Sequence, residues 1–364
     1  MKKEEQNFYK RQINLPNFGI EGQKKLKNSK VLVVGAGGLG SPAILYLAAA
    51  GIGEIGVCDF DNVDITNLHR QIIFDYEQIG NPKTNSSKEK INKFNPFVNI
   101  TEIKEGITAL NVESIIKDFD VVLDCTDNFS TKFLLHDACY LNKINLVQAS
   151  IYQFEGQLQA FNFSDDITSG CFRCLWETMP EDGCVNNCAE AGVLGVVPGI
   201  FGTLQALETI KVLLGWKSLS RNESFIFDLS NLSNKKIKWK KKESCPLCGN
   251  NKKITKIKSE NYNNMENFEI SYENVDLTKF KVVDIRESFE RVEGFLKEDK
   301  IEIEHIPYST LQNSLPEISK DEAYLFYCRS GRRTYELVYR LRKNNFNNTF
   351  SLAEGIVGMN ELLK

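Results

Sequence analysis

The chain has 364 residues and a formal net charge of −3, and at about 150 residues per domain this length predicts two or three domains. A single small module is therefore excluded. Hydrophobic residues make up 42% of the chain and charged residues 26%, proportions that exclude a disordered or fibrous protein. Ten cysteines stand against only three histidines, which indicates that thiols rather than imidazoles carry much of the chemistry.

The chain is expected to be cytoplasmic and to have no membrane span. Its first seven residues include acidic side chains and no apolar stretch, so no secretory signal peptide is predicted. The most apolar window, residues 191–207, is interrupted by glycines and a proline and is predicted to be too broken to cross a bilayer. In a reducing cytosol, cysteines are more often metal ligands or reactive thiols than disulfides.

One segment is strongly basic. Residues 235–258 contain ten lysines and one glutamate, whereas the chain as a whole is slightly acidic. We interpret this run as a solvated basic linker around a metal knuckle, and we expect no nucleic-acid partner.

Short β-rich runs alternate with helical patterns in the first part of the chain. The apolar run Lys30–Gly35 predicts a strand, and Ala43–Ala50 after it predicts a helix closed by Gly51. Three further predicted strands are Ile55–Asp59, Val121–Asp124 and Leu146–Ala149. This alternation predicts a Rossmann-like α/β domain with a mostly parallel sheet. The apolar positions of Pro198–Gly215 predict a helix that packs back on that sheet.

A polar, asparagine-rich segment over residues 259–267 predicts a linker. We therefore expect a first domain over residues 1–258 and a small second α/β domain over residues 268–364, because about 100 residues suffice for a small domain. The predicted elements of the second domain are the strands Lys281–Ile285 and Ala323–Tyr327 and the helix Thr334–Lys343.

A glycine-rich loop follows the first predicted strand and opens a helix. Its G-x-G-x-x-G glycines are Gly35, Gly37 and Gly40, with Gly38 between them. Such glycines let the backbone approach phosphate, while the helix N-terminus supplies N–H donors. Asp59 ends the next strand, where a carboxylate can accept hydrogen bonds from ribose hydroxyls. The loop alone does not distinguish NAD from ATP.

Cations downstream of Asp59 favour a triphosphate. Asn67, Arg70 and Lys83 follow the acidic residue, and an NAD site has no need of two further cations there. Asp127 and Asn128 follow another strand at the same edge of the sheet, where Asp127 can reach Mg²⁺ and Asn128 a base or phosphate edge. Both residues could instead be simple helix caps. The combination favours Mg·ATP.

At this point the sequence resembles the MoeB/ThiF family, the ubiquitin-activating-like adenylyltransferases of small sulfur-carrier proteins. The resemblance rests on motifs in order over about 250 residues: Arg11-Gln12-Ile13, the loop Gly35–Gly40, Asp59-Phe60-Asp61, Asn67-Leu68-His69-Arg70-Gln71, Pro82-Lys83, Asp124-Cys125-Thr126-Asp127-Asn128 and Cys188-Ala189-Glu190-Ala191-Gly192-Val193. It implies that Mg·ATP contacts the following residues: Gly38, Asp59, Asn67, Arg70, Lys83, Asp127 and Asn128. It also implies a homodimer in which Arg11 reaches the partner's nucleotide.

Four cysteines occur in two C-x-x-C pairs, Cys171 with Cys174 and Cys245 with Cys248. Each pair can place two thiolates on one tetrahedral metal at about 2.3 Å. Neither pair opens a helix after a strand, as a thioredoxin-like redox motif does. Four thiolates without a nearby histidine therefore predict a structural Zn²⁺ site, and the resembled family has the same arrangement.

Two more cysteines, Cys184 and Cys188, lie in a polar loop after the first pair. A thiol beside an adenylate site can intercept an activated carbonyl. Cys188 matches the reactive cysteine of the resembled family, while Cys184 could compete or assist. The alternative is that both are thiols without a role.

A third cysteine loop, Cys328-Arg329-Ser330-Gly331-Arg332-Arg333-Thr334, follows an apolar strand and precedes a helix. Backbone N–H groups and three arginines around the sulfur can stabilise a persulfide or a bound oxyanion. A C-x₅-R phosphatase would need arginine where Thr334 stands. The loop instead resembles the active-site loop of rhodaneses, supported upstream by Asp284-Ile285-Arg286-Glu287 and His305-Ile306-Pro307. Residues 294–304 depart from the rhodanese pattern, which leaves the sulfur donor open.

Together these features predict an adenylyltransferase fused to a sulfurtransferase. Arg11, Arg70, Lys83 and Asp127 would neutralise charge while the carboxyl-terminal glycine of a ubiquitin-like carrier ending in Gly-Gly attacks the α-phosphate. Cys328 would then deliver persulfide sulfur, with Cys188 as covalent relay, to give a thiocarboxylate. The expected partners are that carrier, a persulfide donor such as a cysteine desulfurase, and a second copy of the chain. Three alternatives are open: activation of the carrier for conjugation, a scaffold that binds it without activating it, and an NAD-dependent oxidoreductase.

Overall fold

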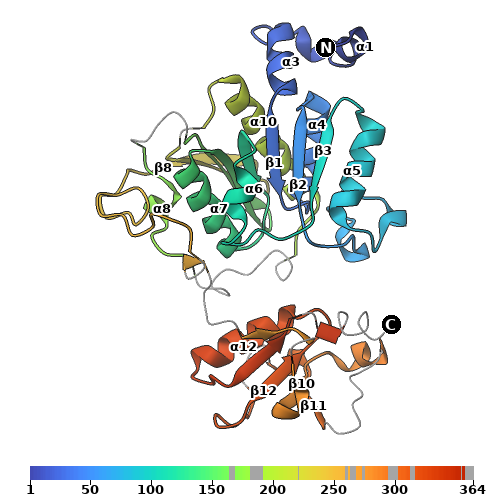
Figure 1. The fold of residues 1–364 in the computed structure, drawn as a ribbon, viewed down its shortest axis with the longest axis vertical. Coiled ribbons are helices and arrows are strands. Elements are labelled where there is room, and N and C mark those ends of the chain that lie inside the picture. Colours follow the sequence, from blue (N-terminus) through green and yellow to red (C-terminus); the bar gives the residue numbers. More distant parts are fainter. Residues whose placement is uncertain are drawn as a thin grey trace. The chain divides into compact units, whose positions relative to one another are not determined.

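A mostly parallel sheet of eight strands organises the first of two units, Met1–Asn264 and Met265–Lys364. Figure 1 draws both units of this computed structural model. The structure describes residues 1–163, 169–180, 192–219, 221–258, 261–262, 268–272, 275–293, 302–311, 316–353 and 355–356.

The strands of unit 1 are β1 (Lys30–Val34), β2 (Glu54–Cys58), β3 (Asn99–Ile103), β4 (Val121–Asp124), β5 (Asn145–Tyr152), β6 (Glu155–Phe161), β7 (Glu223–Asp228) and β8 (Ser233–Lys238). Its α-helices are α1 (Lys3–Phe8), α2 (Lys10–Ile13), α3 (Gly19–Lys27), α4 (Gly40–Ala50), α5 (Lys83–Phe94), α6 (Val112–Ile116), α7 (Phe129–Asn142), α8 (Phe172–Leu175) and α10 (Val196–Leu214), and η1 (Ile65–Asn67) and η2 (Tyr76–Gln78) are 3-10 helices.

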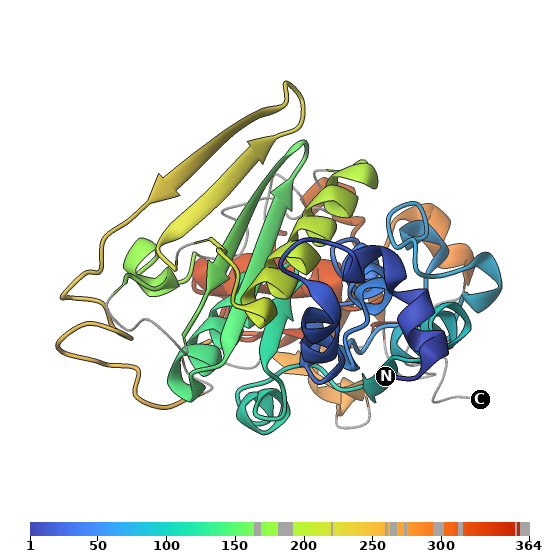
Figure 2. The same ribbon diagram turned by 90° about the horizontal axis from the view of Figure 1, so that it is seen from above.

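The strand order is β3-β2-β1-β4-β5-β6-β7-β8. The first five strands in this order are parallel, whereas β5–β6, β6–β7 and β7–β8 pair antiparallel. Figure 2 shows the antiparallel strands β7 and β8 extending away from the parallel part of the sheet. The Rossmann-like α/β prediction is confirmed, but the antiparallel extension was not predicted, because its strands lack the alternation with helices that revealed the others.

The central strand β1 is buried on both faces. Val31 and Val33 belong to the core that includes α4 and α10, whereas Leu32 and Val34 belong to the core that includes α7 and the paired cysteines. Such two-sided burial is typical of a central parallel strand, because helices cover both faces of the sheet.

Helix α10 is continuous over 19 residues and contacts α4, β5 and β6, as predicted for the segment from Pro198. Among the described helices, it is the one that is long and apolar enough to cross a membrane, and half of its apolar stretch is buried inside the protein. The expectation that glycine and proline break this segment is therefore wrong. Pro198 lies in the first helical turn. Backbone N–H groups there have no partner within the helix, so a proline does not disturb it. A core helix passes the same test of length and composition.

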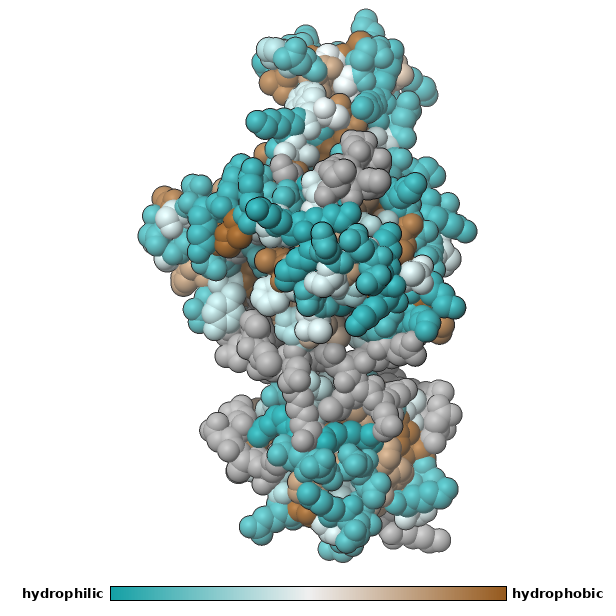
Figure 3. All heavy atoms as spheres, turned by 90° about the vertical axis from the view of Figure 1, so that its left-hand side faces the viewer, coloured by the Kyte–Doolittle hydropathy of each residue, from teal (hydrophilic) through white to brown (hydrophobic). Residues whose placement is uncertain are grey.

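The basic segment is partly a strand and not only a linker. Its first residues form β8, in which every residue is exposed, and all ten lysines of residues 235–258 are exposed. Figure 3, which views the side of unit 1 that carries β8, is largely hydrophilic there.

Unit 2 contains a five-stranded parallel sheet in the order β11-β10-β12-β13-β9. Its elements are β9 (Glu269–Ile270), η5 (Leu277–Lys279), β10 (Lys281–Asp284), η6 (Ser288–Glu293), β11 (Ile303–His305), α11 (Tyr308–Leu311), β12 (Tyr324–Tyr327), α12 (Arg332–Lys343) and β13 (Thr349–Leu352). The predicted strands at 281 and 323 and the helix at 334 are present, with ends that differ by one or two residues.

Candidate active site

The glycine-rich loop lies where the order of the parallel sheet reverses. It leaves the carboxyl end of β1, which has β2 on one side and β4 on the other, and ligands of open α/β sheets bind at such a switch point. Gly35 has a φ of +92°, and a Cβ there would lie 2.9 Å from the carbonyl oxygen of Cys125. A Cβ on Gly40 would lie 1.9 Å from the oxygen of Gly35. Glycine is therefore required at both ends of the loop.

The middle of the loop is more open. A Cβ on Gly37 would meet only the amide nitrogen of Gln71, at 3.8 Å, whereas one on Gly38 would lie 3.1 Å from Pro198 of α10. The same position at Gly38 is 3.7 Å from Cγ of Arg70. The structure thus brings Arg70 beside the loop and leaves the backbone at Gly37 accessible to a phosphate.

Asp59 is tied to the loop itself. Its Oδ2 accepts a hydrogen bond of 2.7 Å from the N–H of Ala36, and its Oδ1 accepts one of 2.9 Å from the N–H of Asp61. Burial is the largest influence on this carboxyl and raises its pKa, while Lys83 and the two N–H donors oppose the rise. Asp59 therefore fixes the conformation of the loop, in addition to its predicted contact with ribose.

Lys83 is almost fully buried and points toward both carboxylates of the Asp59-Phe60-Asp61 motif. Its Nζ lies 2.9 Å from Oδ2 of Asp61 and 3.8 Å from Oδ1 of Asp59. Sequence reasoning missed Asp61 as its closer partner, although the spacing of two residues along a strand end was a usable signal. These carboxylates hold the ammonium group at the same edge of the sheet as the loop.

Asn67 and Arg70 form a second polar pair. Nη2 of Arg70 donates to Oδ1 of Asn67 at 2.6 Å, and Nη1 donates to the oxygen of Thr66 at 3.2 Å. Asp64 caps the 3-10 helix η1 through the N–H of Thr66. The cap by Asp64 fixes the helix η1 that carries Asn67. The side chain of Asn67 in turn orients the guanidinium group of Arg70.

Asp127 and Asn128 are exposed at the carboxyl end of β4. Oδ1 of Asn128 accepts a hydrogen bond of 2.8 Å from the N–H of Thr131, so Asn128 is the N-cap of α7. Asn128 is thus a helix cap, as the alternative interpretation predicted. The capping bond uses only Oδ1 of Asn128 and does not involve its side-chain nitrogen. Thr126, directly before Asp127, donates to Oδ1 of Asp124 through both its N–H and its hydroxyl.

Arg11 is not part of this cluster. It is exposed on α2, whose Gln12 donates to the carbonyl oxygen of Ala50 at the last residue of α4. The glycine loop lies at the first residue of α4, and eleven helical residues separate the two ends by about 16 Å. Arg11 is therefore at the opposite edge of the sheet from the loop of its own chain.

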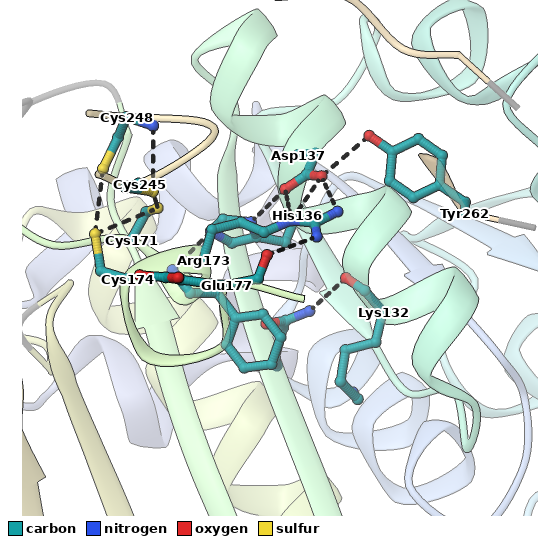
Figure 4. Close-up of polar contacts among 12 residues, drawn as sticks. Lys132, His136, Asp137, Cys171, Arg173, Cys174, Glu177, Cys245, Cys248 and Tyr262 are labelled. Carbon is teal, nitrogen blue, oxygen red and sulfur yellow. Dashed lines mark hydrogen bonds and ion pairs between the residues drawn. The ribbon is translucent and has the colours of Figure 1, made fainter. Parts of the chain in front are cut away.

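The four paired cysteines meet in one buried cluster. Their Sγ atoms lie within 4.8 Å of one another, with separations of 3.9 Å for Cys171 and Cys174, 3.6 Å for Cys171 and Cys245, and 3.3 Å for Cys174 and Cys248. Figure 4 shows the sulfur atoms facing one another. Tetrahedral Zn²⁺ with Zn–S distances of about 2.3 Å places sulfurs about 3.8 Å apart, so the cluster fits this metal.

Backbone groups support the cluster, as a metal–thiolate centre requires. The N–H of Lys242 points to Sγ of Cys174 and the N–H of Cys248 to Sγ of Cys245, each at 3.4 Å. Cys171 is the N-cap of the single-turn helix α8, but this helix does not directly follow a strand, because β6 ends at Phe161.

A buried polar cluster beside the cysteines was missed from sequence. Oδ2 of Asp137 accepts bonds from Nη2 of Arg173 at 2.7 Å and from the hydroxyl of Tyr262 at 3.0 Å. His136 donates from Nδ1 to Oδ1 of Asp137 at 3.0 Å, because its Nε2 accepts from the N–H of Phe172. Burial lowers the pKa of His136, which keeps the ring neutral. The available signal was Arg173, a cation between two metal ligands.

Cys184 and Cys188, the predicted relay thiols, lie in residues 181–191, outside the described part of the chain. Three other cysteines, Cys58, Cys125 and Cys139, are buried among apolar residues. Burial raises the pKa of each of them, to about 12 for Cys58. They therefore remain protonated core residues.

In unit 2, Cys328 directly follows β12 and begins a tightly turned loop. Gly331 has a φ of +83°, and a Cβ there would lie 2.0 Å from the carbonyl oxygen of Ala353. Sγ of Cys328 is 3.8 Å from the hydroxyl of Thr334, which donates to the oxygen of Gly331 and accepts from Ser351. Thr334 therefore holds the loop closed around the sulfur.

The arginines near Cys328 are not all equivalent. Arg333 makes a bidentate ion pair with Glu290, with distances of 2.7 and 2.6 Å. This pair, more than the neighbouring Cys328, raises the pKa of Arg333, and the same pair lowers the pKa of Glu290. Arg286 of the predicted upstream motif is buried against Asp284. The positive charge expected around the sulfur is thus partly compensated.

Comparison with known proteins identifies the family of unit 1. A family model described as the ThiF family matches residues 9–247. The chain belongs to the ThiF family. Among curated relatives of this ThiF-family chain, the adenylyltransferase and sulfurtransferase MOCS3 of Culex quinquefasciatus is 42% identical over 250 residues, which are 68% of this chain and 56% of that protein. The chain thus spans about half the length of the first curated relatives it matches.

Two other relatives extend the comparison of this ThiF-family protein. The sulfur carrier protein adenylyltransferase of Thermus thermophilus is 41% identical over 68% of this chain and 92% of its own length. The adenylyltransferase and sulfurtransferase UBA4 of Kluyveromyces lactis is 36% identical over 90% of this chain and 81% of its own length. The solved structure of E. coli MccB with ATP has a TM-score of 0.56 and 22% identity over 62% of this chain and 69% of that chain, which supports the fold.

Proposed function

We propose that this protein adenylates the carboxyl-terminal glycine of a small ubiquitin-like sulfur carrier and then converts the adenylate to a thiocarboxylate. The observation that carries the proposal is the meeting of the open glycine loop with Arg70 and Lys83 at the switch point of the sheet. Two fixed cations beside a phosphate loop suit a nucleotide that must part with pyrophosphate. The curated relatives named adenylyltransferase support the same step.

In the first step, a carboxylate oxygen of the carrier attacks the α-phosphorus of ATP and pyrophosphate leaves. Lys83 and Arg70 neutralise charge on the phosphates, and Asp59 accepts from the ribose while holding the loop through Ala36. Asp127 would hold Mg²⁺, which neutralises the leaving pyrophosphate when bound, and Asn128 would contact the nucleotide through its amide. The remaining proposed contacts are the backbone groups of Gly35, Gly37, Gly38 and Gly40. No general base is needed, because the attacking carboxylate is already ionised.

In the second step, sulfur reaches the activated carbonyl. The thiol of Cys188 takes the acyl group as a thioester and AMP leaves. The terminal sulfur of a Cys328 persulfide then attacks the thioester carbonyl, and the Cys188 thiolate leaves. A small thiol then attacks Sγ of Cys328 in the resulting acyl disulfide, and the carrier thiocarboxylate leaves. A second small thiol reduces the mixed disulfide that remains on Cys328. The persulfide would come from a donor such as a cysteine desulfurase.

Two structural roles complete the proposal. Cys171, Cys174, Cys245 and Cys248 hold a structural Zn²⁺, for which their spacing and buried N–H donors are suited.

A homodimer would supply Arg11 to the partner's nucleotide, and the position of Arg11 at the far end of α4 supports this assignment. We assign residues 1–258 to the adenylation domain, 259–267 to a linker and 268–364 to a rhodanese-like domain. The described cysteines form no disulfide, which fits a cytoplasmic location.

The test is ATP–pyrophosphate exchange that depends on a carrier ending in Gly-Gly. The expected result is exchange with the wild-type chain, its loss in Asp127→Ala, and its retention in Cys328→Ala together with loss of thiocarboxylate. No exchange with any candidate carrier, alongside NADH turnover, would overturn the proposal in favour of an oxidoreductase. Carrier binding and function that survive Asp127→Ala would indicate a scaffold, and carrier conjugation that survives Cys328→Ala would indicate a conjugation enzyme.

A further inference from the structure

One face of helix α10 lies against separate parts of the candidate nucleotide site. A Cβ on Gly195, the N-cap, would lie 2.2 Å from the carbonyl oxygen of His69, next to the arginine of the site. A Cβ on Gly202 would lie 2.1 Å from the carbonyl oxygen of Leu39 in the glycine loop. Gln205 follows three residues after Gly202, so it lies on the same side of the helix. Two glycines thus let α10 approach the site closely, and Gln205 continues this face.

Gln205 is fully buried, and its side chain joins α10 to two neighbouring strands. Its Nε2 donates to the carbonyl oxygen of Asp124, the last residue of β4, at 2.8 Å and to that of Val147 in β5 at 3.4 Å. Its Oε1 accepts a bond of 3.5 Å from the thiol of Cys125. A buried amide is costly unless its polar atoms are hydrogen-bonded, and both polar atoms of this amide are bonded.

The segment held by Gln205 lies directly against the glycine loop. A Cβ on Gly35 would lie 2.9 Å from the carbonyl oxygen of Cys125, and one on Gly40 would lie 3.6 Å from Cβ of the same cysteine. Two residues further along the chain, the segment reaches Asp127, the proposed Mg²⁺ ligand. A shift of this segment would therefore change the separation between the phosphate loop and the carboxylate of Asp127.

We propose that Gln205 is a positioning residue that fixes residues 124–127 against the glycine loop and thereby sets the geometry in which the loop and Asp127 bind the nucleotide. The inference rests on the proposed adenylation step and adds to it a residue that is buried behind the site. An amide suits this role, because it has donors for the carbonyl oxygen of Asp124 and an acceptor for the thiol of Cys125.

The experiment compares the full-length variant Gln205→Met with the wild type. Methionine has a similar length and keeps the site filled, but it makes none of the three hydrogen bonds. Hydrogen exchange without nucleotide reports the position of the segment, because the N–H of Cys125 donates to the carbonyl oxygen of Val34 in β1. We expect exchange at Cys125 and Thr126 to be at least about tenfold faster in the variant.

Isothermal titration with Mg·ATP reports the consequence for the site. We expect the affinity of Gln205→Met to fall about tenfold, since displacements of about 1 Å in a bound geometry cost up to about a hundredfold. Gln205→Asn is the second variant. It keeps a buried amide but is one methylene shorter, so it should also lose affinity. Unchanged affinity for Mg·ATP in either folded variant overturns the inference.

Thr209→Val is the matched control. Thr209 is also buried in α10, and its hydroxyl donates to the backbone oxygen of Gln205 at 2.8 Å, so valine removes one buried hydrogen bond but none to β4. Exchange at Cys125 and the affinity for Mg·ATP should keep their wild-type values. Equal losses in Thr209→Val and Gln205→Met would show a general weakening of α10 and overturn the inference. A wild type that binds no Mg·ATP overturns the proposed function together with the inference, so the two failures are distinguishable.

Discussion

The ammonium group of Lys132 lies 2.7 Å from Oδ2 of Asp124, and both side chains are buried. The same Oδ2 accepts from the amide of Gln148 at 2.9 Å, while Oδ1 accepts twice from Thr126. Asp124 ends β4, so this pair fixes the turn that carries Asp127 to the edge of the sheet. An ion pair placed here determines the geometry of the proposed Mg²⁺ ligand.

Lys132→Met should destabilise unit 1 strongly. Loss of one partner of a buried ion pair leaves an uncompensated charge, for which about 3–5 kcal/mol of unfolding free energy is typical. Urea unfolding measures the effect, and the double variant Lys132→Met with Asp124→Asn should recover more than half of it, because both charges are then removed. A loss below about 1 kcal/mol in the single variant would contradict a structural role for this pair.

Gly40→Ala should weaken nucleotide binding, because its Cβ would lie 1.9 Å from a backbone oxygen of the loop. The loop must move to admit the methyl group, and we expect the affinity for Mg·ATP in isothermal titration to fall at least about tenfold. Gly199→Ala is the matched control. Gly199 lies in α10 with nothing within 4 Å of its added Cβ, so alanine there should keep the affinity and stabilise the helix by about 0.5–1 kcal/mol.

Removal of the proposed zinc should lower the unfolding temperature. Seventy residues lie between Cys174 and Cys245, so a shared metal joins distant segments, and metal binding adds directly to folding stability. We expect about one zinc per chain by elemental analysis, its loss in Cys245→Ser, and its retention in Cys139→Ser, which alters a buried thiol outside the cluster. A purified protein without zinc whose unfolding temperature ignores a strong chelator would refute the site.

Acid should weaken unit 1 through His136. Burial lowers the pKa of this histidine in the folded state, so the unfolded chain takes up a proton that the folded chain excludes. The stabilising contribution is complete above the unfolded pKa of about 6.5 and is lost as the pH falls below it, by up to about 1.4 kcal/mol per pH unit. Denaturant unfolding from pH 7.5 to 5.5 measures this slope. His136→Asn should reduce the slope, whereas the exposed His69→Gln should leave it unchanged; equal slopes in all three proteins would contradict the assignment.

Thr334→Val should impair the sulfur-carrying loop and spare adenylation. The hydroxyl of Thr334 contacts Sγ of Cys328 and holds the oxygen of Gly331, so valine removes both contacts at nearly constant volume. We expect mass spectrometry of the donor-treated chain to show a several-fold lower persulfide yield. Thr334→Ser keeps the hydroxyl and should keep the yield. A wild-type yield in the valine variant would show that the hydroxyl is dispensable.

Local patterns made much of the fold predictable. The strand, loop and helix from Lys30 to Gly51 carry their own signals: an apolar run, spaced glycines, and a C-terminal glycine with a φ of +85°. The antiparallel strands β6 to β8 lack such signals, because their stability comes from cross-strand pairing with partners distant in sequence. The lysines of β8 also mask its strand character.

Candidate site residues were predictable where their type limits their use. Four cysteines in two pairs have few structural alternatives, so their meeting could be foreseen from spacing alone. The partnerships of Arg333 with Glu290 and of Asp137 with Tyr262 could not be foreseen, because long-range ion pairs and hydrogen bonds depend on how separate elements pack. The sequence indicated where charged side chains are needed, but not which partner residues form ion pairs or hydrogen bonds with them.

The exposed strand β8 ends the eight-stranded sheet in the described part of the chain. A bare outer strand presents unpaired N–H and C=O groups and can recruit another chain into a growing β-aggregate. Three of its six residues are lysines, and their mutual repulsion disfavours the approach of a second identical edge. The lysines of β8 therefore disfavour self-association of the protein through this edge of its sheet.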